Sequence, residues 1–294
     1  MDLEQKAIER LKAASDMSLR LYKHPLVITY SGGKDSDALL HLAEASGIPF
    51  EVLHSLTTAD APQTVYHVRD TFHRLEDKGI KCTVDKHVQP DGSRITMWNL
   101  IPRKLMPPTR VVRYCCAVLK EGGGKDRFIA TGVRWDESAA RKKNRGALEV
   151  ITAKKENSLI LSNDNSEDRR LFESCQLKGK RVVNPIVDWK TDDVLAYIEA
   201  EHIPMNPLYG CGFSRVGCIG CPMAGKAGRK AEFAMFPKFK AAYIRSFDRM
   251  MEERKRRGKA ENCNWGHDGV DIFHWWMEDG VIPGQEVLDG FEEI

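Results

Sequence analysis

The chain has 294 residues, of which 42% are hydrophobic and 30% charged, a balance typical of a globular chain that can bury a sizeable core. The 45 Lys and Arg residues against 42 Asp and Glu residues leave a formal net charge of +3, which excludes a histone-like polycation but not a local basic face. No apolar run approaches the roughly 18 to 20 residues of a membrane span, and the N-terminus lacks the apolar core of a signal peptide. We therefore expect a cytoplasmic protein that does not engage a membrane.

Strands and helices are predicted to alternate along the first half of the chain. Amphipathic spacing and short β-branched apolar runs carry this prediction. The predicted helices cover residues 3–22, 37–45 and 64–78, and the predicted strands cover residues 26–30, 50–53, 82–84 and 128–131. Such alternation is typical of an α/β fold with a doubly wound, mostly parallel sheet and helices on both faces.

The second half of the chain departs from this alternation. Residues 141–180 are predicted to form a polar insert, and a helix is predicted over residues 188–201. Pro and Cys-Gly interruptions indicate a loop-rich site module up to residue 228. The rest of the chain is charged and helical in pattern. We therefore predict two domains, residues 1–228 with the Cys-rich site and residues 229–294 as a helical C-terminal extension.

A glycine-rich loop, Ser31-Gly32-Gly33-Lys34-Asp35-Ser36, joins the first predicted strand to the helix after it. Glycines let backbone N–H groups approach an anion closely, and a helix N-terminus adds partial positive charge. Lys34 supplies a full charge, and the two serines supply hydroxyl donors. Two glycines alone would favour a simple tight turn, but Ser, Lys, Asp and Ser in this order after an apolar strand favour a nucleotide phosphate site.

This loop resembles the signature of the PP-loop ATP pyrophosphatases. Members of that family bind the pyrophosphate end of ATP on the loop and activate a substrate by adenylation. The resemblance implies an adenine nucleotide alpha-hydrolase-like fold and ATP with Mg²⁺ as the bound nucleotide. It assigns nucleotide contacts to all six loop residues and catalytic roles to Lys34 and Asp35.

Five of the eight cysteines fall into two groups. Cys115 and Cys116 are adjacent, and Cys211, Cys218 and Cys221 follow in a glycine-rich stretch. A Cys-x-x-Cys pair between glycines can turn both thiolates toward one point, which suits an iron–sulfur cluster or zinc. A redox dithiol and inert buried thiols are the alternatives, and spacing alone does not separate a cluster from zinc. The remaining cysteines, predicted to be ordinary thiols, are Cys82, Cys175 and Cys263.

A wider set of motifs resembles the phosphoadenylyl-sulfate (PAPS) reductase family over roughly residues 25–225. The motifs are Cys-Cys before Leu-Lys, Thr-Gly-Val-Arg-Trp-Asp-Glu-Ser, Asn-Pro-Ile-Val-Asp-Trp and Gly-Cys-Ile-Gly-Cys-Pro. Cluster-containing members hold a [4Fe–4S] cluster with a Cys-Cys pair and a later Cys-x-x-Cys. Members similar to the sulfur-incorporating enzyme of DNA phosphorothioation instead have one Cys first and an extra Cys before the Cys-x-x-Cys. The resemblance therefore implies Cys115, Cys218 and Cys221 as ligands, with Cys116 or Cys211 as the fourth.

Further nucleotide contacts are predicted around Arg134, Glu137 and Ser138, which follow the last strand before the insert. Ligands bind at the carboxyl ends of strands in open α/β sheets, and an arginine there can pair with phosphate or sulfate. A solvated loop arginine is the alternative. The family resemblance adds Gly132 and, for contacts to adenosine, Asp60. It also makes Arg134 a predicted catalytic residue.

The motifs favour ATP-driven sulfur chemistry over sulfonucleotide reduction. Family reductases carry a C-terminal cysteine that attacks the sulfate sulfur, whereas residues 289–294 contain none. They also tend to have a degenerate loop, whereas this loop has the full ATP-hydrolysing form. The prediction is an enzyme that adenylates an acceptor, releases pyrophosphate and couples this to sulfur transfer at an Fe–S site. A sulfonucleotide reductase that releases sulfite is the second candidate, and a non-catalytic nucleotide or redox sensor is the third.

The acceptor is predicted only as a class. Basic clusters at residues 141–145 and 254–259 could contact nucleic-acid phosphates, and solvated protein faces are the alternative. The candidate partners are an adenine nucleotide, a nucleic-acid acceptor or partner protein, and a protein that donates sulfur or electrons.

Overall fold

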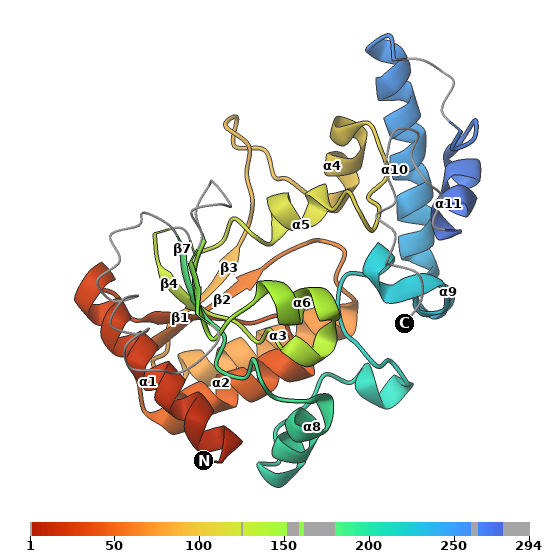
Figure 1. Ribbon diagram of the computed structural model, residues 1–294. Coiled ribbons are helices and arrows are strands. Elements are labelled where there is room, and N and C mark those ends of the chain that lie inside the picture. The colour runs from red at the N-terminus through yellow and green to blue at the C-terminus, as the bar shows by residue number, and fades with distance from the viewer. Residues whose placement is uncertain (1, 125, 152–158, 162–179, 260–263, 279–294) are drawn as a thin grey trace. The chain divides into compact units, whose positions relative to one another are not determined.

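The computed structural model describes residues 2–124, 126–151, 159–161, 180–259 and 264–278. The chain forms two compact units, each assembled from three segments (Figure 1). Unit 1 consists of Met1–Ser55, Pro62–Asp85 and Gly122–Val216, and unit 2 consists of Leu56–Ala61, Lys86–Glu121 and Gly217–Ile294. These units interleave along the chain and do not correspond to two consecutive segments. The division into domains 1–228 and 229–294 stays a prediction.

Unit 1 contains a seven-stranded sheet of order β3-β2-β1-β4-β7-β5-β6. Its strands are β1 (Leu26–Thr29), β2 (Phe50–Ser55), β3 (Cys82–Asp85), β4 (Phe128–Ala130), β5 (Leu148–Ile151), β6 (Leu159–Leu161) and β7 (Lys180–Val183). The first five strands of that order pair in parallel, and β5 pairs antiparallel with both β7 and β6. The mostly parallel, doubly wound sheet predicted from the sequence is confirmed.

Four helices of unit 1 share one hydrophobic core with strands of this sheet, namely α1 (Leu3–Tyr22), α2 (Lys34–Ser46), α3 (Pro62–Glu76) and α8 (Thr191–Ala200). Unit 1 also contains α6 (Ala139–Asn144), which contributes no buried residue, and the short 3₁₀ turns η1 (Trp135–Glu137) and η3 (Tyr209–Cys211). Leu26 and Ile28 of β1 belong to the core formed with α1, α2, α3 and α8, whereas Val27 joins a small cluster with Ile129 and Val182. This alternation follows from the two-residue period of a strand.

The predicted polar insert carries two strands of the sheet. β5 and β6 extend it beyond β7, and a Cβ atom on Gly146 would lie 2.3 Å from the carbonyl oxygen of Leu161. Glycine is therefore required where the chain enters β5. Residues 152–158 and 162–179 of the insert, with Cys175, lie outside the described residues.

Unit 2 is helical and has an aromatic core. Its helices are α4 (Met97–Lys104), α5 (Tyr114–Leu119), α9 (Gly225–Met235), α10 (Pro237–Arg256) and α11 (Gly269–Met277), with the 3₁₀ turn η4 (Pro222–Ala224). Phe233, Tyr243 and Trp276 contact one another in this core. A Cβ atom on Gly220, whose φ is +73°, would lie 2.5 Å from Phe233 Cζ. The glycine therefore lets the Cys-x-x-Cys segment pack directly on the aromatic core.

No described helix is both long enough and apolar enough to cross a bilayer.

Candidate nucleotide loop and cysteine site

The glycine-rich loop lies at the point where the strand order of unit 1 reverses. β1 has β2 on one side and β4 on the other, and the carboxyl end of β1 runs directly into residues 31–36. Ligands of open α/β sheets bind outside the carboxyl ends of strands at this kind of reversal. The structure therefore places the predicted phosphate loop where the fold favours a ligand.

Gly32 has a backbone conformation that side chains disfavour. Its φ is +74°, and an added Cβ would lie 3.0 Å from Val68 Cγ2 and 3.2 Å from Thr64 Cγ2 of α3. Glycine meets both constraints, because it tolerates positive φ and has no side chain. The first glycine of the motif thus lets the loop pack closely against α3.

The Ser36 hydroxyl organises the loop internally. It accepts hydrogen bonds from the backbone N–H groups of Ser31 and Gly33, each at 3.2 Å, and donates to the Gly33 carbonyl at 2.8 Å. The Ser31 hydroxyl donates to Ser36 Oγ at 3.2 Å. Both predicted hydroxyl donors therefore form bonds within the loop, and direct nucleotide contacts from them stay a prediction.

Lys34, Asp35 and Arg134 form a row of alternating charges beside the loop. Asp35 Oδ1 accepts a hydrogen bond from Arg134 Nε at 2.7 Å, and Lys34 Nζ lies 3.0 Å from Asp35 Oδ2. A Cβ atom on Gly132 would lie 3.0 Å from the Asp35 carbonyl oxygen. Gly132 therefore allows the segment after β4 to approach the start of α2, where Arg134 reaches Asp35.

Arg134 is buried, with 2% of its surface exposed, so the alternative of a solvated loop arginine is wrong. Its Nη1 atom lies 3.4 Å from the Trp189 carbonyl oxygen, and both Nη atoms lie 3.3 Å from Thr191 Oγ1. The guanidinium thus bonds to groups of the protein itself, and its link to the loop is the hydrogen bond to Asp35. Direct pairing of Arg134 with phosphate stays a prediction.

Glu137 and Ser138 shape the turn after Arg134. Glu137 Oε1 accepts from the Arg134 backbone N–H at 3.1 Å and also pairs with Arg141, while Ser138 caps α6 by accepting from the Arg141 N–H at 3.2 Å. Burial, together with the positive charges of Arg145 and Arg215, lowers the pKa of Arg141. Several cationic side chains therefore gather near Asp35.

Asn206 and Tyr209 contact the loop and were not predicted from the sequence. Asn206 Nδ2 donates to the Gly32 carbonyl at 2.9 Å and to Thr64 Oγ1 at 3.1 Å. The Tyr209 hydroxyl accepts from the Lys34 backbone N–H at 2.9 Å. The Asn-Pro pair at residues 206–207 predicts a turn. A turn signal does not indicate a contact with residues about 170 positions away in the chain.

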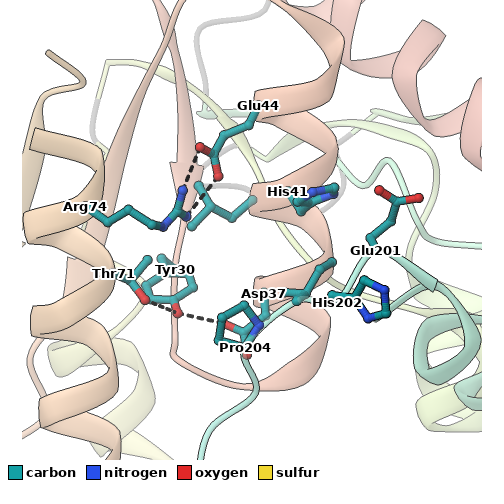
Figure 2. A pocket seen from close by; sticks show the side chains of 11 residues that line it. Tyr30, Asp37, His41, Glu44, Thr71, Arg74, Glu201, His202 and Pro204 are labelled. Carbon is teal, nitrogen blue, oxygen red and sulfur yellow. Dashed lines mark hydrogen bonds and ion pairs between the residues drawn. The ribbon is translucent and has the colours of Figure 1, made fainter. Parts of the chain in front are cut away.

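A cavity of about 250 Å³ is lined by Tyr30 and by residues of α2, α3 and the segment after α8 (Figure 2). At its base the Tyr30 hydroxyl donates to Asp37 Oδ1 at 2.6 Å, and His67 Nε2 lies 2.9 Å from the same oxygen. Burial and the Asp37 charge raise the pKa of Tyr30. Because Tyr30 and Asp37 flank the loop in sequence, this bond braces both of its ends.

The second candidate site is a group of four cysteines in unit 2. Cys115 and Cys116 lie in α5, and Cys218 and Cys221 precede η4. All four line one cavity of about 30 Å³ together with Lys120. Among the described residues, no three Cys, His, Asp or Glu side chains meet closely enough to hold a single metal ion.

Hydrogen bonding and burial shift the pKa values of Cys115, Cys116 and Cys218 in different directions. The hydrogen bond from Cys115, with the charges of Lys120 and Arg113, lowers the pKa of Cys116 to about 6, whereas that same bond and burial raise the pKa of Cys115. Burial raises the pKa of Cys218 to about 11. The hydrogen bond between the two adjacent thiols thus favours the proton on Cys115 and the ionised form of Cys116.

Asp60 belongs to the cysteine unit. Its carboxylate accepts from the Thr57 N–H at 3.2 Å and from the Thr57 hydroxyl at 2.7 Å, and its backbone forms an antiparallel bridge with Cys218. The Cys218 thiol donates to Thr57 Oγ1 at 3.3 Å. Asp60 therefore helps to position Cys218, and its predicted contact with adenosine stays a prediction.

Cys211 belongs to unit 1 and not to the unit that contains these four cysteines. It is exposed in η3 of unit 1, whereas Cys116 lies in unit 2 with Cys115, Cys218 and Cys221. Cys82 lies partly buried in β3. Cys263 lies outside the described residues.

The sequence of this chain is similar to those of several known proteins. Over 195 residues the chain is 31% identical to sulfate adenylyltransferase subunit 2 of Methylobacterium radiotolerans, covering 62% of this chain and 56% of that protein. An uncharacterized protein of Methanocaldococcus jannaschii is 26% identical over 267 residues, or 88% of this chain and 54% of its own length. A 51-residue stretch is 43% identical to adenosine 5'-phosphosulfate reductase of Sinorhizobium fredii, covering 17% of this chain and 20% of that enzyme. Apart from that short match, the chain spans about half the length of these curated relatives.

Solved structures with a related arrangement include phosphoadenylyl-sulfate (PAPS) reductase from Candida auris. It is 17% identical, with a TM-score of 0.46 over 72% of this chain and 88% of that chain. The U34-tRNA thiolase NcsA from Methanococcus maripaludis, solved with its [4Fe-4S] cluster, is 14% identical, with a TM-score of 0.43 over 86% of this chain and 80% of that chain.

The family model of the phosphoadenosine phosphosulfate reductase domain matches residues 25–224. This match spans more than half of the chain and includes the loop, the segment after β4 and all five clustered cysteines. The chain therefore belongs to the phosphoadenosine phosphosulfate reductase domain family.

Proposed function

We propose that the chain is an enzyme of sulfur metabolism that uses ATP to adenylate an acceptor and then replaces the activated oxygen with sulfur. The observation that carries the proposal is the complete loop between β1 and α2, where backbone N–H groups and Lys34 lie at the reversal of strand order. A helix N-terminus of this kind favours bound phosphate. The named relatives act on sulfate or on its adenylyl derivative, which supports the same class of chemistry.

In the first step an acceptor oxygen attacks the α-phosphorus of ATP. A new P–O bond forms, the bond to the β-phosphate breaks, and pyrophosphate leaves. Lys34 neutralises charge that develops on the leaving group, and a bound Mg²⁺ would supply further positive charge there. Asp35 holds Lys34 Nζ at 3.0 Å, and Asp35 is itself held by Arg134, so the ammonium is positioned before ATP binds.

In the second step a sulfide-level nucleophile displaces AMP from the activated acceptor. The oxygen that was adenylated leaves with AMP, and sulfur takes its place. The cysteines of unit 2 are the groups of this chain suited to handling sulfur or to holding a cluster beside it. Among them, Cys116 has a pKa lowered by the hydrogen bond from Cys115 and by the charges of Lys120 and Arg113, which favours its thiolate form.

For the donor set of unit 2 we propose a [4Fe–4S] cluster rather than zinc. Zinc needs all four sulfur atoms within about 2.3 Å of one point, and the thiols do not meet in that way. A four-iron cluster takes one thiolate on each iron and so holds the thiolates further apart. We assign the four ligand positions to Cys115, Cys116, Cys218 and Cys221. The cavity that these side chains line has a volume of about 30 Å³, which accommodates little more than a water. The four side chains would therefore have to move apart to admit a cluster. A bound cluster would supply sulfide or electrons.

The test is anaerobic purification followed by an assay of pyrophosphate release. We expect a brown protein with bound iron and sulfide, and release of pyrophosphate from ATP only when a suitable acceptor is added. A colourless protein with stoichiometric zinc would contradict the cluster. Failure to bind ATP would contradict the adenylation step.

A sulfonucleotide reductase is the second candidate, favoured by the 43% identity to adenosine 5'-phosphosulfate reductase over 51 residues. The two enzymes are separated by supplying adenylyl sulfate and thioredoxin without ATP. Our proposal predicts no sulfite, whereas sulfite release at a catalytic rate would favour the reductase.

For the acceptor we propose a nucleic acid, on the basis of charge. The described residues of unit 2 contain nineteen Lys and Arg against ten Asp and Glu, a net charge of +9, whereas those of unit 1 contain twenty against twenty-one, a net charge of −1. On α10, Lys238, Arg245 and Arg249 are exposed at a spacing that places them on one side of the helix. Such a row can contact successive phosphates.

Salt-dependent binding of a mixed RNA pool tests this assignment. Arg245→Glu with Arg249→Glu should weaken binding about tenfold and reduce the slope of log affinity against log salt. Lys12→Glu, an exposed change on α1, is the matched control and should have little effect. Equal effects of both changes, or no binding by the wild type, would contradict the assignment.

A further inference from the structure

The Tyr209 hydroxyl lies directly on the glycine-rich loop of unit 1. It accepts a hydrogen bond from the Lys34 N–H at 2.9 Å, and a Cβ atom on Gly33 would lie 3.4 Å from it. The segment that carries Tyr209 is fixed in place, because buried Asn206 donates to the Gly32 carbonyl at 2.9 Å. Tyr209 is therefore part of the loop's immediate surroundings.

The hydroxyl uses only part of its hydrogen-bonding capacity. A phenol has one O–H donor and two acceptor lone pairs. One lone pair is bound by the Lys34 N–H, and the described residues offer no acceptor for the O–H proton. A donor is thus left over beside the first N–H of α2, where a helix favours an anion.

Charges of both signs act on the Tyr209 hydroxyl. Burial, together with the negative charges of Asp35 and Asp37, raises the pKa of Tyr209 to about 12, so the phenol keeps its proton at neutral pH and can donate it. The positive charge of Arg215, on the same segment, acts on the hydroxyl in the opposite direction, and Asp35 is itself paired with Lys34 and Arg134. A simple packing role for the tyrosine would require the ring but not a free O–H beside the loop.

We propose that the Tyr209 hydroxyl binds the pyrophosphate end of the nucleotide, accepting from the Lys34 N–H while it donates its own proton to a phosphate oxygen. The inference rests on the proposed ATP-binding function and adds a residue outside the loop to it. It makes Tyr209 a specificity residue for nucleotides with β- and γ-phosphates, since AMP places no group at that end.

The test measures binding of ATP, inorganic pyrophosphate and AMP to the full chain by calorimetry. Tyr209→Phe keeps the ring and removes the hydroxyl. We expect affinity for ATP and pyrophosphate to fall about 10- to 100-fold, the value of a hydrogen bond to a charged group, with AMP binding changed less than about twofold. Tyr197→Phe is the matched control, because the Tyr197 hydroxyl contacts His41 Nδ1 at 2.9 Å instead of the loop, and it should bind all three ligands as the wild type does.

Each other outcome overturns the inference in a recognisable way. Tighter ATP binding by Tyr209→Phe would mean that the hydroxyl competes with phosphate for the Lys34 N–H. An equal loss for AMP and ATP, with a lowered melting temperature, would mean that Tyr209 only supports the fold. Unchanged ATP binding would remove the inference and leave the proposed function standing, whereas a wild type that binds neither ATP nor pyrophosphate would remove both.

Discussion

The two candidate sites differ in how complete they are before a ligand binds. In unit 1 the two serines bond to one another and to the loop backbone, and Asp35 accepts from Arg134, with distances of 2.7 to 3.2 Å. In unit 2 two adjacent thiols form a hydrogen bond beside Lys120, whose pKa is raised by the nearby cysteines. A preorganised site gains affinity because its geometry costs little to form, whereas a metal site draws part of its folding free energy from the metal. Damage to the two sites should therefore have separable effects.

The largest expected effect comes from replacing a cysteine of unit 2. Cys116→Ser should remove iron from the protein and lower sulfur transfer roughly 100-fold or more, because it deletes a proposed ligand. Binding of ATP should remain. Iron and acid-labile sulfide analysis with ATP calorimetry measures both. Cys211→Ser is the control, and loss of iron from that variant instead would reassign the fourth ligand to Cys211.

Lys34→Met should have the reverse pattern. Pyrophosphate release should fall about 10²- to 10³-fold, because a positive charge aimed at the leaving group is removed, while the iron content stays at the wild-type level. Steady-state assays with saturating ATP, together with iron analysis, check this. A parallel loss of iron would show that the two sites do not fail independently.

A smaller effect is expected from Gly32→Ala. Positive φ alone should cost about 1–2 kcal/mol for a residue with a side chain, and the Cβ contact at 3.0 Å with Val68 should add to that and displace the loop. Gly47→Ala is a matched control, since φ is +69° there and no atom lies within 4 Å of the added Cβ. Chemical denaturation and ATP binding should show a greater loss of both quantities for Gly32→Ala. Identical losses would mean that close packing on α3 is unimportant.

At Asp188, which belongs to neither site, the expected effect is on stability alone. Burial would raise its pKa, but hydrogen bonds from Arg10 at 2.7 Å and Lys6 at 2.7 Å outweigh burial and lower it. A lowered pKa means that the ionised group stabilises the fold above the ordinary value near 4 and stops doing so as the pH falls below it. Asp188→Asn should therefore cost about 1–3 kcal/mol at pH 7, with the difference from wild type shrinking below about pH 4. A constant difference between pH 7 and pH 3 would contradict this.

Local sequence signals were enough to predict much of unit 1. The β-branched run of β1, the two glycines and the amphipathic pattern of α2 are consecutive in the chain, so the strand, loop and helix could be predicted together. The two strands of the insert could not, because their pairing with β7 depends on contacts between distant residues. Helix α11 lies in the stretch that was predicted only as a helical extension, without bounds for its helices.

The parts of the sites that the sequence missed or left open depend on long-range contacts. Cys211 and Cys218 are seven residues apart, yet they belong to different units, so spacing could not decide the fourth ligand. Arg134 follows a strand like many exposed loop arginines, and only Trp189 and Thr191 reveal that it is buried. Tyr209 reaches the loop from 175 residues away in the chain.

The shortness of the outer strands has a consequence for self-association. In the part of the chain that the structure describes, the outer strands of the unit 1 sheet are β3, with four residues, and β6, with three. These short strands leave few of their own backbone N–H and C=O groups to face outward, and Lys81 and Lys86 flank β3 with positive charge. Short, charged edges are poor templates for strand addition by a second molecule. The architecture thus limits edge-to-edge aggregation at concentrations where longer open sheets would begin to pair.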